Sequence, residues 1–137
     1  LDDIAAEVLA KRIDGVIVSN TTIGRADLRD RQRAEAGGLS GRPLFERSTA
    51  VLARMRKLLG PDLAIIGVGG VDSAETALEK ILAGADLVQL YTGMIYAGPA
   101  LPARILTGLS RHVAAARVKS IAELRDRRLE AWAAKPI

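Results

Sequence analysis

The stretch Leu63-Ala64-Ile65-Ile66-Gly67-Val68-Gly69-Gly70 begins as an apolar run and ends on two glycines. A short apolar run without polar alternation is typical of a β-strand that is buried on both faces. Similar runs occupy residues 15–19 and 86–91. Helical periodicity predicts helices at residues 2–12, 45–59, 72–84 and 99–118. Strands of this kind that alternate with helices indicate parallel βαβ units, so the predicted fold class is α/β.

Two architectures contain parallel βαβ units, a doubly wound sheet and a (β/α)8 barrel. A dinucleotide-binding turn needs the spacing G-x-G-x-x-G, but Asp72 stands where the third glycine should be. Asp72, with Glu75 three residues later, instead predicts the start of a helix. The P-loop spacing G-x-x-x-x-G-K-[ST] does not occur in the sequence. Both nucleotide-binding fingerprints are therefore excluded.

Glycines follow two successive strands. Gly69-Gly70 ends one strand and Tyr91-Thr92-Gly93 ends the next. Consecutive βα loops of this kind can offer backbone N–H groups to a phosphate, and in (β/α)8 barrels that site follows strands 7 and 8. The three strands are then the sixth, seventh and eighth of an incomplete TIM barrel. For either glycine cluster by itself, a tight turn without a ligand is the alternative.

The composition limits the class of protein. The chain has 137 residues, of which 49% are hydrophobic and 26% charged, so it has the length of one domain and can bury a core. It has no Cys, which excludes disulfides, thiolate nucleophiles and Cys-based metal sites. We find no signal peptide and no membrane-spanning stretch in the sequence. Because the chain starts at Leu1 without an initiator Met, we expect a piece of a longer protein.

Basic residues gather toward the carboxyl end. Residues 103–137 contain eight basic and three acidic residues, and the net charge of the whole chain is +4. Apart from Trp132 no aromatic residue is interleaved with them, which favours a solvated helix face over a nucleic-acid site. The only histidine, His112, has no carboxylate three or four positions away, so neither a catalytic triad nor a metal site is predicted.

A last helix is predicted after residue 119. Ser120 and Glu123 have the spacing of a capping box. Ile121, Leu124 and Trp132 would form the apolar side of this helix. We expect it to pack on the outside of the barrel, across the first helix.

The segment after the first strand carries polar groups. Ser19-Asn20-Thr21-Thr22 supplies one amide and three hydroxyls at the strand end that a barrel uses as its catalytic face. An Asn side chain both donates and accepts hydrogen bonds, which suits a planar ligand that contains an amide or imide. A turn that caps the strand is the alternative interpretation. The long polar stretch that follows, up to residue 43, shows no clear period.

Five motifs occur in order along the chain. They are residues 19–22, residues 37–44 with Ser48-Thr49, residues 65–71, residues 83–93 and Gly98-Pro99. With this order and spacing the chain resembles the carboxyl-terminal half of the class 2, quinone-dependent dihydroorotate dehydrogenases, over roughly residues 1–110. Arg42-Pro43-Leu44 is similar to class 2 rather than to the soluble class 1 enzymes. The absence of Cys agrees, because the resemblance implies a Ser base in class 2 and a Cys base in class 1.

The resemblance implies an FMN enzyme that oxidises dihydroorotate to orotate and passes the electrons to a quinone, the fourth step of pyrimidine (UMP) biosynthesis. It implies a protein bound peripherally to the cytoplasmic side of the cell membrane, although this chain itself is expected to be soluble. Ser19 departs from the Thr often found there but keeps the hydroxyl. The implied roles are orotate binding by Asn20 and Thr21, flavin contact by Ser19, N–H donation to FMN by Gly41 and Gly70, and contact with the phosphate end of FMN by Tyr91 and Thr92.

By the same resemblance the Ser base, a flavin-binding Lys and the helical pair that admits quinone lie before residue 1, so no catalytic residue is expected in this chain. Residues 1–137 are then the carboxyl-terminal portion of one barrel domain, with residues 110–137 as a helical extension. Three strands leave both sheet edges unpaired and apolar faces uncovered. We therefore expect the chain alone to be inactive, and to be unstable or to self-associate.

Two other functions stay open. A flavin-free phosphate-binding barrel enzyme, such as an isomerase or synthase, would share the two glycine-bearing loops. A non-catalytic half-barrel could bind a phosphate compound as a dimer. Only the resemblance around Asn20 favours the dehydrogenase over both.

Overall fold

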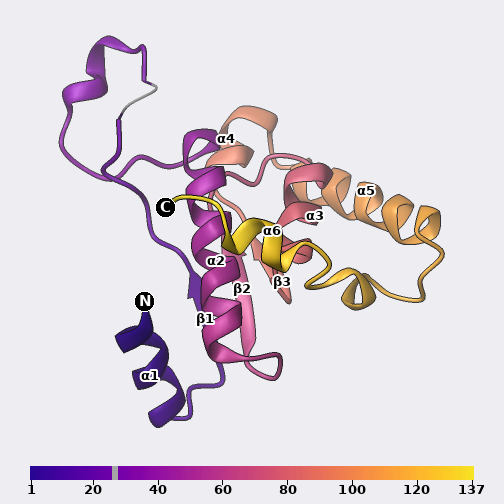
Figure 1. Cartoon of the computed structure of the whole chain (residues 1–137). Helices are drawn as coiled ribbons and strands as arrows, with labels where there is room; N and C mark the ends of the chain where they lie inside the picture. Colours follow the sequence, from indigo (N-terminus) through magenta and orange to yellow (C-terminus); the bar gives the residue numbers. More distant parts are fainter. Residues whose placement is uncertain (26–27) are drawn as a thin grey trace.

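A three-stranded parallel sheet is the centre of the computed structural model, which describes residues 1–25 and 28–137 (Figure 1). The strands are β1 (Gly15–Val18), β2 (Ala64–Val68) and β3 (Leu87–Gln89), in that order across the sheet. The predicted parallel βαβ units are confirmed. β3 is shorter than predicted, because it ends at Gln89 and not at Tyr91.

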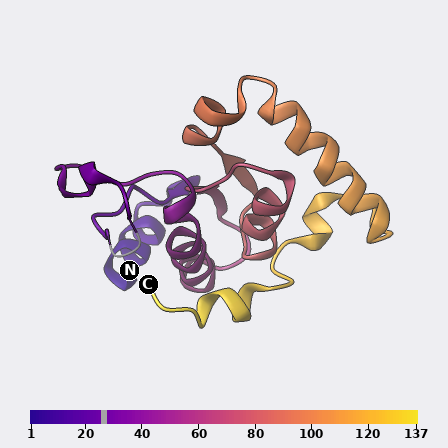
Figure 2. The same cartoon turned by 90° about the horizontal axis from the view of Figure 1, so that it is seen from above.

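Helices cover one face of this sheet (Figures 1 and 2). α2 (Phe45–Leu59) packs on β1 and β2, and α3 (Ala74–Leu82) packs on β3. α1 (Asp2–Ala10) lies beside α2, and α5 (Leu101–Ala115) lies against α3. The shorter elements are η1 (Arg31–Ala34), η2 (Arg42–Leu44), α4 (Thr92–Ala97), η3 (Ile121–Leu124) and α6 (Leu129–Ala133). Within residues 1–25 and 28–137, no helix is both long and apolar enough to span a bilayer.

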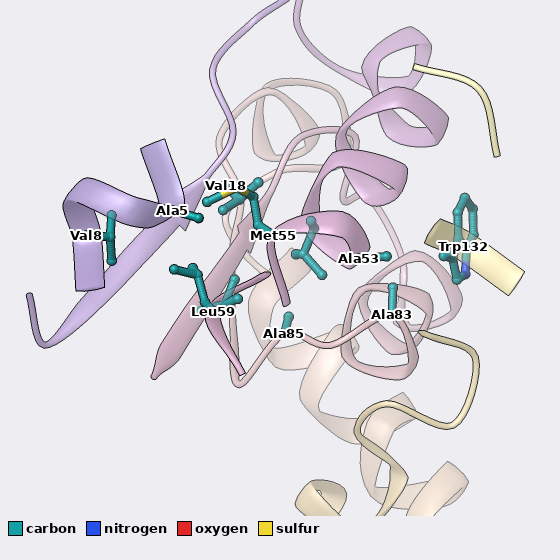
Figure 3. Packing of buried hydrophobic residues seen from close by; sticks show 11 residues of the cluster. Ala5, Val8, Val18, Ala53, Met55, Leu59, Ala83, Ala85 and Trp132 are labelled. Atoms are coloured by element: carbon teal, nitrogen blue, oxygen red, sulfur yellow. The ribbon is translucent and has the colours of Figure 1, made fainter. Parts of the chain in front are cut away.

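The larger hydrophobic core lies between the sheet and α2. Met55 and Leu59, one helical turn apart on α2, are buried together with Val18 of β1 (Figure 3). Ala53, on another side of the same helix, packs toward Trp132 of α6. α2 is thus buried on several sides, which fits a helix that lies between the sheet and the carboxyl-terminal segment.

The other face of the sheet is open. Ile17 of β1 and Leu87 of β3 are 59% and 60% exposed, and both are in register with Ile66. In the part of the chain that the structure describes, β1 and β3 each pair with β2 alone. The expected unpaired edges and uncovered apolar surface are therefore present.

The predicted cap of α3 is wrong by one residue. Ser73, not Asp72, is the N-cap: its Oγ accepts from the Thr76 N–H at 3.2 Å, and Thr76 Oγ1 accepts from the Ser73 N–H at 3.0 Å. The Asp72 carboxylate instead accepts from Arg42 Nε at 2.9 Å. Asp and Ser are both good caps, so the sequence alone did not distinguish the two neighbouring starts.

The helix predicted over residues 99–118 is shorter, and a separate helix precedes it. α4 ends at Gly98, whose φ of 79° stops the helix. α5 then begins at Leu101, with Pro102 in its first turn, and ends at Ala115. Arg117 has a φ of 54°, which cannot continue an α-helix.

The single helix predicted after residue 119 is also wrong. The capping box of Ser120 and Glu123 is present, but it opens only the 3-10 turn η3. An extended Arg125 (ψ 144°) and Asp126 with a φ of 68° then separate η3 from α6. α6 packs on α2, whereas the expected position was across the first helix. The sequence predicted that Trp132 packs on the outside of the barrel, but it did not predict that α2 is the helix it packs on.

A charged cluster joins α2 to the start of β3 and to the carboxyl-terminal segment. The buried Arg56 forms an ion pair with Asp86, which also pairs with Arg125. Arg56 Nε donates to the Gly84 carbonyl at 2.8 Å. Burial raises the pKa of Asp86, but the hydrogen bond from the Ile65 N–H and the two guanidinium groups together hold that pKa below its usual value. Asp86 is therefore a structural carboxylate.

Candidate functional site

A cavity of about 910 Å³ opens at the carboxyl ends of the three strands. Its wall contains residues 19–21 after β1, residues 39–44 before α2, residues 68–72 after β2 and residues 90–93 after β3. (β/α)8 barrels place their sites at this end of the sheet. The volume suits a small organic ligand.

All of the predicted site residues line this one cavity. They are Ser19, Asn20, Thr21, Gly41, Gly70, Tyr91 and Thr92. They come from four segments that lie far apart in the sequence, so the folding of the chain brings them together. What each residue binds stays a prediction.

The Asn20 side chain is partly used by its own turn. Its Oδ1 accepts from the Thr21 N–H at 2.8 Å, which is the strand-capping interaction that the sequence left open. The second lone pair of this oxygen accepts only a long bond, from Thr21 Oγ1 at 3.4 Å. In the described part of the chain the Nδ2 group of Asn20 donates to no acceptor, and the residue is exposed. The turn therefore orients Asn20 and leaves donor and acceptor capacity for a ligand.

Glycine is required at position 70. Gly70 has a φ of 74°, and a Cβ there would lie 2.5 Å from Phe45 Cβ and 2.9 Å from the Phe45 nitrogen. Gly41, with a φ of 76°, is similarly close to Thr92, since a Cβ would lie 3.1 Å from Thr92 Cγ2. Among residues 1–25 and 28–137, the N–H groups of Gly41 and Gly70 have no hydrogen-bond acceptor. Both are available to a ligand in the cavity.

Two neighbouring loops of the cavity are bonded to each other. Thr92 Oγ1 donates to Ser40 Oγ at 3.0 Å, which links the start of α4 to the loop that contains Gly41. Tyr91 is 75% exposed, so its side chain does not fill the cavity in place of a ligand. The Thr92 side chain therefore lies at the contact between these loops.

Sequence reasoning missed an ion pair at the mouth of the cavity. Arg42 Nη2 and Asp72 Oδ2 lie 2.8 Å apart, and both residues line the cavity. The Arg42 side chain is 83% exposed, so the pair adds little stability. It does place a guanidinium group beside the glycine turn. Arg42 and Asp72 are 30 positions apart, and no motif in the sequence connects them.

Sequence reasoning also missed a buried lysine behind the glycine turn. Lys80 of α3 is fully buried, and its Nζ donates to Ser48 Oγ at 2.6 Å. Burial lowers the pKa of Lys80 to about 7. A signal was present, because Lys80 lies three positions after Ala77 and directly before Ile81, on the buried face of the helix.

Comparison with known proteins supports the sequence-based resemblance. A family model described as Dihydroorotate dehydrogenase matches residues 1–113. The chain is 72% identical over its whole length to a dihydroorotate dehydrogenase (quinone) of Mesorhizobium japonicum, and it covers 38% of that protein. It is 67% identical to the protein of the same name from Sinorhizobium fredii, again over 100% of this chain and 38% of the relative.

Two solved structures of dihydroorotate dehydrogenases also resemble this chain. The ligand-free type of dihydroorotate dehydrogenase from Eimeria tenella superposes with a TM-score of 0.87 at 37% identity, over 98% of this chain and 36% of the other. The enzyme from the same organism in complex with ferulenol gives 0.86 at 39% identity, over 90% and 33%. The three-stranded sheet is thus part of the barrel that the sequence predicted. This chain, which spans about 38% of the length of its curated relatives, belongs to the dihydroorotate dehydrogenase family.

Proposed function

We propose that this chain supplies part of the FMN and orotate sites of a quinone-dependent dihydroorotate dehydrogenase. The observation that carries the proposal is the convergence of seven residues from four segments on one cavity, in a chain of this family. The reaction is the oxidation of dihydroorotate to orotate in pyrimidine synthesis. Residues 1–137 act as a portion of a single barrel domain, with residues 110–137 as an extension packed on its outside.

The cavity fits the phosphate end of FMN. The N–H groups of Gly41 and Gly70 have no acceptor among the described residues, and anionic groups bind well to such backbone donors. The Thr92 hydroxyl is close by, since it bonds to Ser40 in the same loop as Gly41. Tyr91, exposed at the start of α4, is free to contact the same ligand.

The other end of the cavity fits a planar imide ring. Among the described residues the Asn20 amide NH2 donates to no acceptor, and its Oδ1 accepts from the Thr21 N–H at 2.8 Å and only over 3.4 Å from the Thr21 hydroxyl. These groups can match the alternating donors and acceptors of dihydroorotate and orotate. Ser19 directly follows β1 and lines the same cavity, and its proposed role is contact with the flavin.

When bound, FMN would supply the redox chemistry of this reaction, the transfer of an electron pair from dihydroorotate to a quinone. The residues of this chain bind and orient the two ligands. The Ser base and a membrane-contacting segment that admits quinone are assigned by resemblance to parts of the longer protein outside these residues. We therefore propose that residues 1–137 alone do not turn over.

A paired assay tests this function. The full-length chain, meaning a chain of the relatives' length that contains residues 1–137, is purified with FMN and assayed with dihydroorotate and a soluble quinone or dye. Thr21→Ala should lower kcat/KM by at least about tenfold, because it removes a substrate hydrogen bond. Thr107→Ala is the matched control, since Thr107 is exposed on α5 and does not line the cavity.

Three results would contradict the proposal. If the full-length chain did not oxidise dihydroorotate, the proposed activity would be wrong. If Thr21→Ala and Thr107→Ala lost equal activity, the assignment of Thr21 to the substrate site would be wrong. Clear turnover by residues 1–137 alone would show that the base does not lie outside them.

A further inference from the structure

The turn that contains Gly70 is held from behind by a buried charged side chain. Lys80 Nζ donates to Ser48 Oγ at 2.6 Å and to the Val68 carbonyl at 3.3 Å. Ser48 Oγ lies 3.1 Å from the Gly69 carbonyl oxygen and 3.2 Å from the Phe45 carbonyl oxygen, and its one hydroxyl proton can be donated to either. The two carbonyls that are held belong to the two residues directly before Gly70.

These bonds determine where the Gly70 N–H points. The peptide bond between Gly69 and Gly70 is trans, and in a planar trans peptide the C=O and the N–H point in opposite directions. Because the Gly69 C=O is held toward Ser48, the Gly70 N–H points away from Ser48. That N–H has no acceptor among the described residues, and Gly70 lines the cavity. Ser48 and Lys80 therefore keep a backbone donor available to a ligand.

Lys80 is an unfavourable residue for packing alone. It is 0% exposed, and in the described part of the chain no carboxylate forms an ion pair with it. The Phe45 ring, 5.3 Å from Nζ, gives only a weak cation–π contact. A buried ammonium group costs free energy unless its donors are satisfied, whereas a methionine would fill similar space without a charge. The two bonds toward the glycine turn are the feature that a methionine could not replace.

We propose that Lys80 and Ser48 are positioning residues for the phosphate-binding side of the FMN site. Lys80 fixes the Ser48 hydroxyl and the Val68 carbonyl, Ser48 fixes the Gly69 carbonyl, and the Gly70 N–H is thereby presented to the phosphate. The inference rests on the proposed function, because it requires FMN in this cavity.

Riboflavin, which is FMN without its phosphate, separates this role from a general structural one. The full-length chain is freed of flavin and titrated with FMN and with riboflavin, and the ratio of the two dissociation constants is the readout. Lys80→Met and Ser48→Ala should each lower the preference for FMN about tenfold, the effect of one lost charge-assisted hydrogen bond. Lys57→Met, at an exposed lysine of α2 that pairs with Glu130, is the matched control and should keep the wild-type ratio.

The outcomes are distinct. A merely structural role would weaken both flavins alike, so a ratio within about twofold of wild type in folded Lys80→Met overturns the inference. If circular dichroism shows that Lys80→Met does not fold, Ser48→Ala decides by the same criterion. If the wild-type chain binds neither flavin, the proposed function itself is wrong. If it prefers FMN and both variants keep that preference, only the positioning role is wrong.

Discussion

The indole Nε1–H of Trp132 donates a hydrogen bond to the Glu79 carboxylate over 2.8 Å, and this bond joins α6 to α3. Arg128 pairs with the same carboxylate. The Trp132 ring meets the Phe45 ring edge-on, with 5.8 Å between their centroids. The carboxyl-terminal segment is therefore bound to both α2 and α3, the two helices that connect the strands.

Replacing Trp132 with Ala should destabilise the fold. The side chain is 3% exposed, so its removal leaves a cavity and takes one hydrogen bond from Glu79, which keeps its ion pair with Arg128, and we expect a loss of about 3 kcal/mol in the free energy of unfolding. Urea unfolding of the full-length chain measures it. Tyr96→Ala, at an aromatic residue that is 88% exposed, is the control and should cost little. Equal losses in the two variants would refute the packing role of α6.

Asp86→Asn should destabilise the protein at neutral pH and cease to matter in acid. Removal of the charge takes the short ion pair from the buried Arg56 and leaves it the longer one to Asp126, at 3.8 Å, which costs about 2 kcal/mol. The folded-state pKa of Asp86 lies below its unfolded value, so its contribution is present above the unfolded pKa and is lost as the pH falls through the folded pKa. Unfolding curves of variant and wild type should converge below about pH 4. A gap that persists in acid would contradict this assignment.

Lys80 predicts a rise of stability with pH as well, but over a more alkaline range than Asp86. Its pKa is about 7 in the folded chain, against an ordinary value of 10.5. Between these values the unfolded chain binds a proton that the folded chain lacks, so stability rises with pH. Lys80→Met lacks this dependence. The difference in unfolding free energy between Lys80→Met and the wild type, in favour of the variant, should be largest below pH 7 and should decrease as the pH rises toward 10.5. A difference between variant and wild type that is constant with pH would refute the lowered pKa.

Gly70→Ala should abolish FMN binding, and Gly60→Ala should not. Both glycines have a positive φ, 74° and 80°, so both substitutions strain the backbone by roughly 1–3 kcal/mol. Only at Gly70 would the Cβ meet another residue, Phe45, since nothing lies within 4 Å of a Cβ at Gly60. Flavin fluorescence measures FMN affinity, and urea unfolding measures the shared strain. If Gly70→Ala bound FMN with unchanged affinity, the assignment of this turn to the FMN site would be wrong.

The sequence predicted well those helices and strands whose apolar periodicity is uninterrupted and ends at a clear stop. α2 begins at Phe45 and ends at Leu59 as expected, because one apolar stripe and a Gly-Pro stop define it. The predicted site residues line one cavity, because parallel strands bring their carboxyl ends to the same edge of a sheet. The break at Asp126 was missed, since a left-handed backbone at a non-glycine residue has no local signature.

The sequence by itself determined the parallel α/β fold, the family and the residues that gather at the strand ends, because each depends on short motifs and their order. Tertiary structure alone decided how these parts hold one another. The packing of Trp132 on α2 and the bond from Lys80 to Ser48 depend on residues that are distant along the chain. A buried polar group must find its partner in space, and which acceptor lies within reach is fixed only when the helices pack.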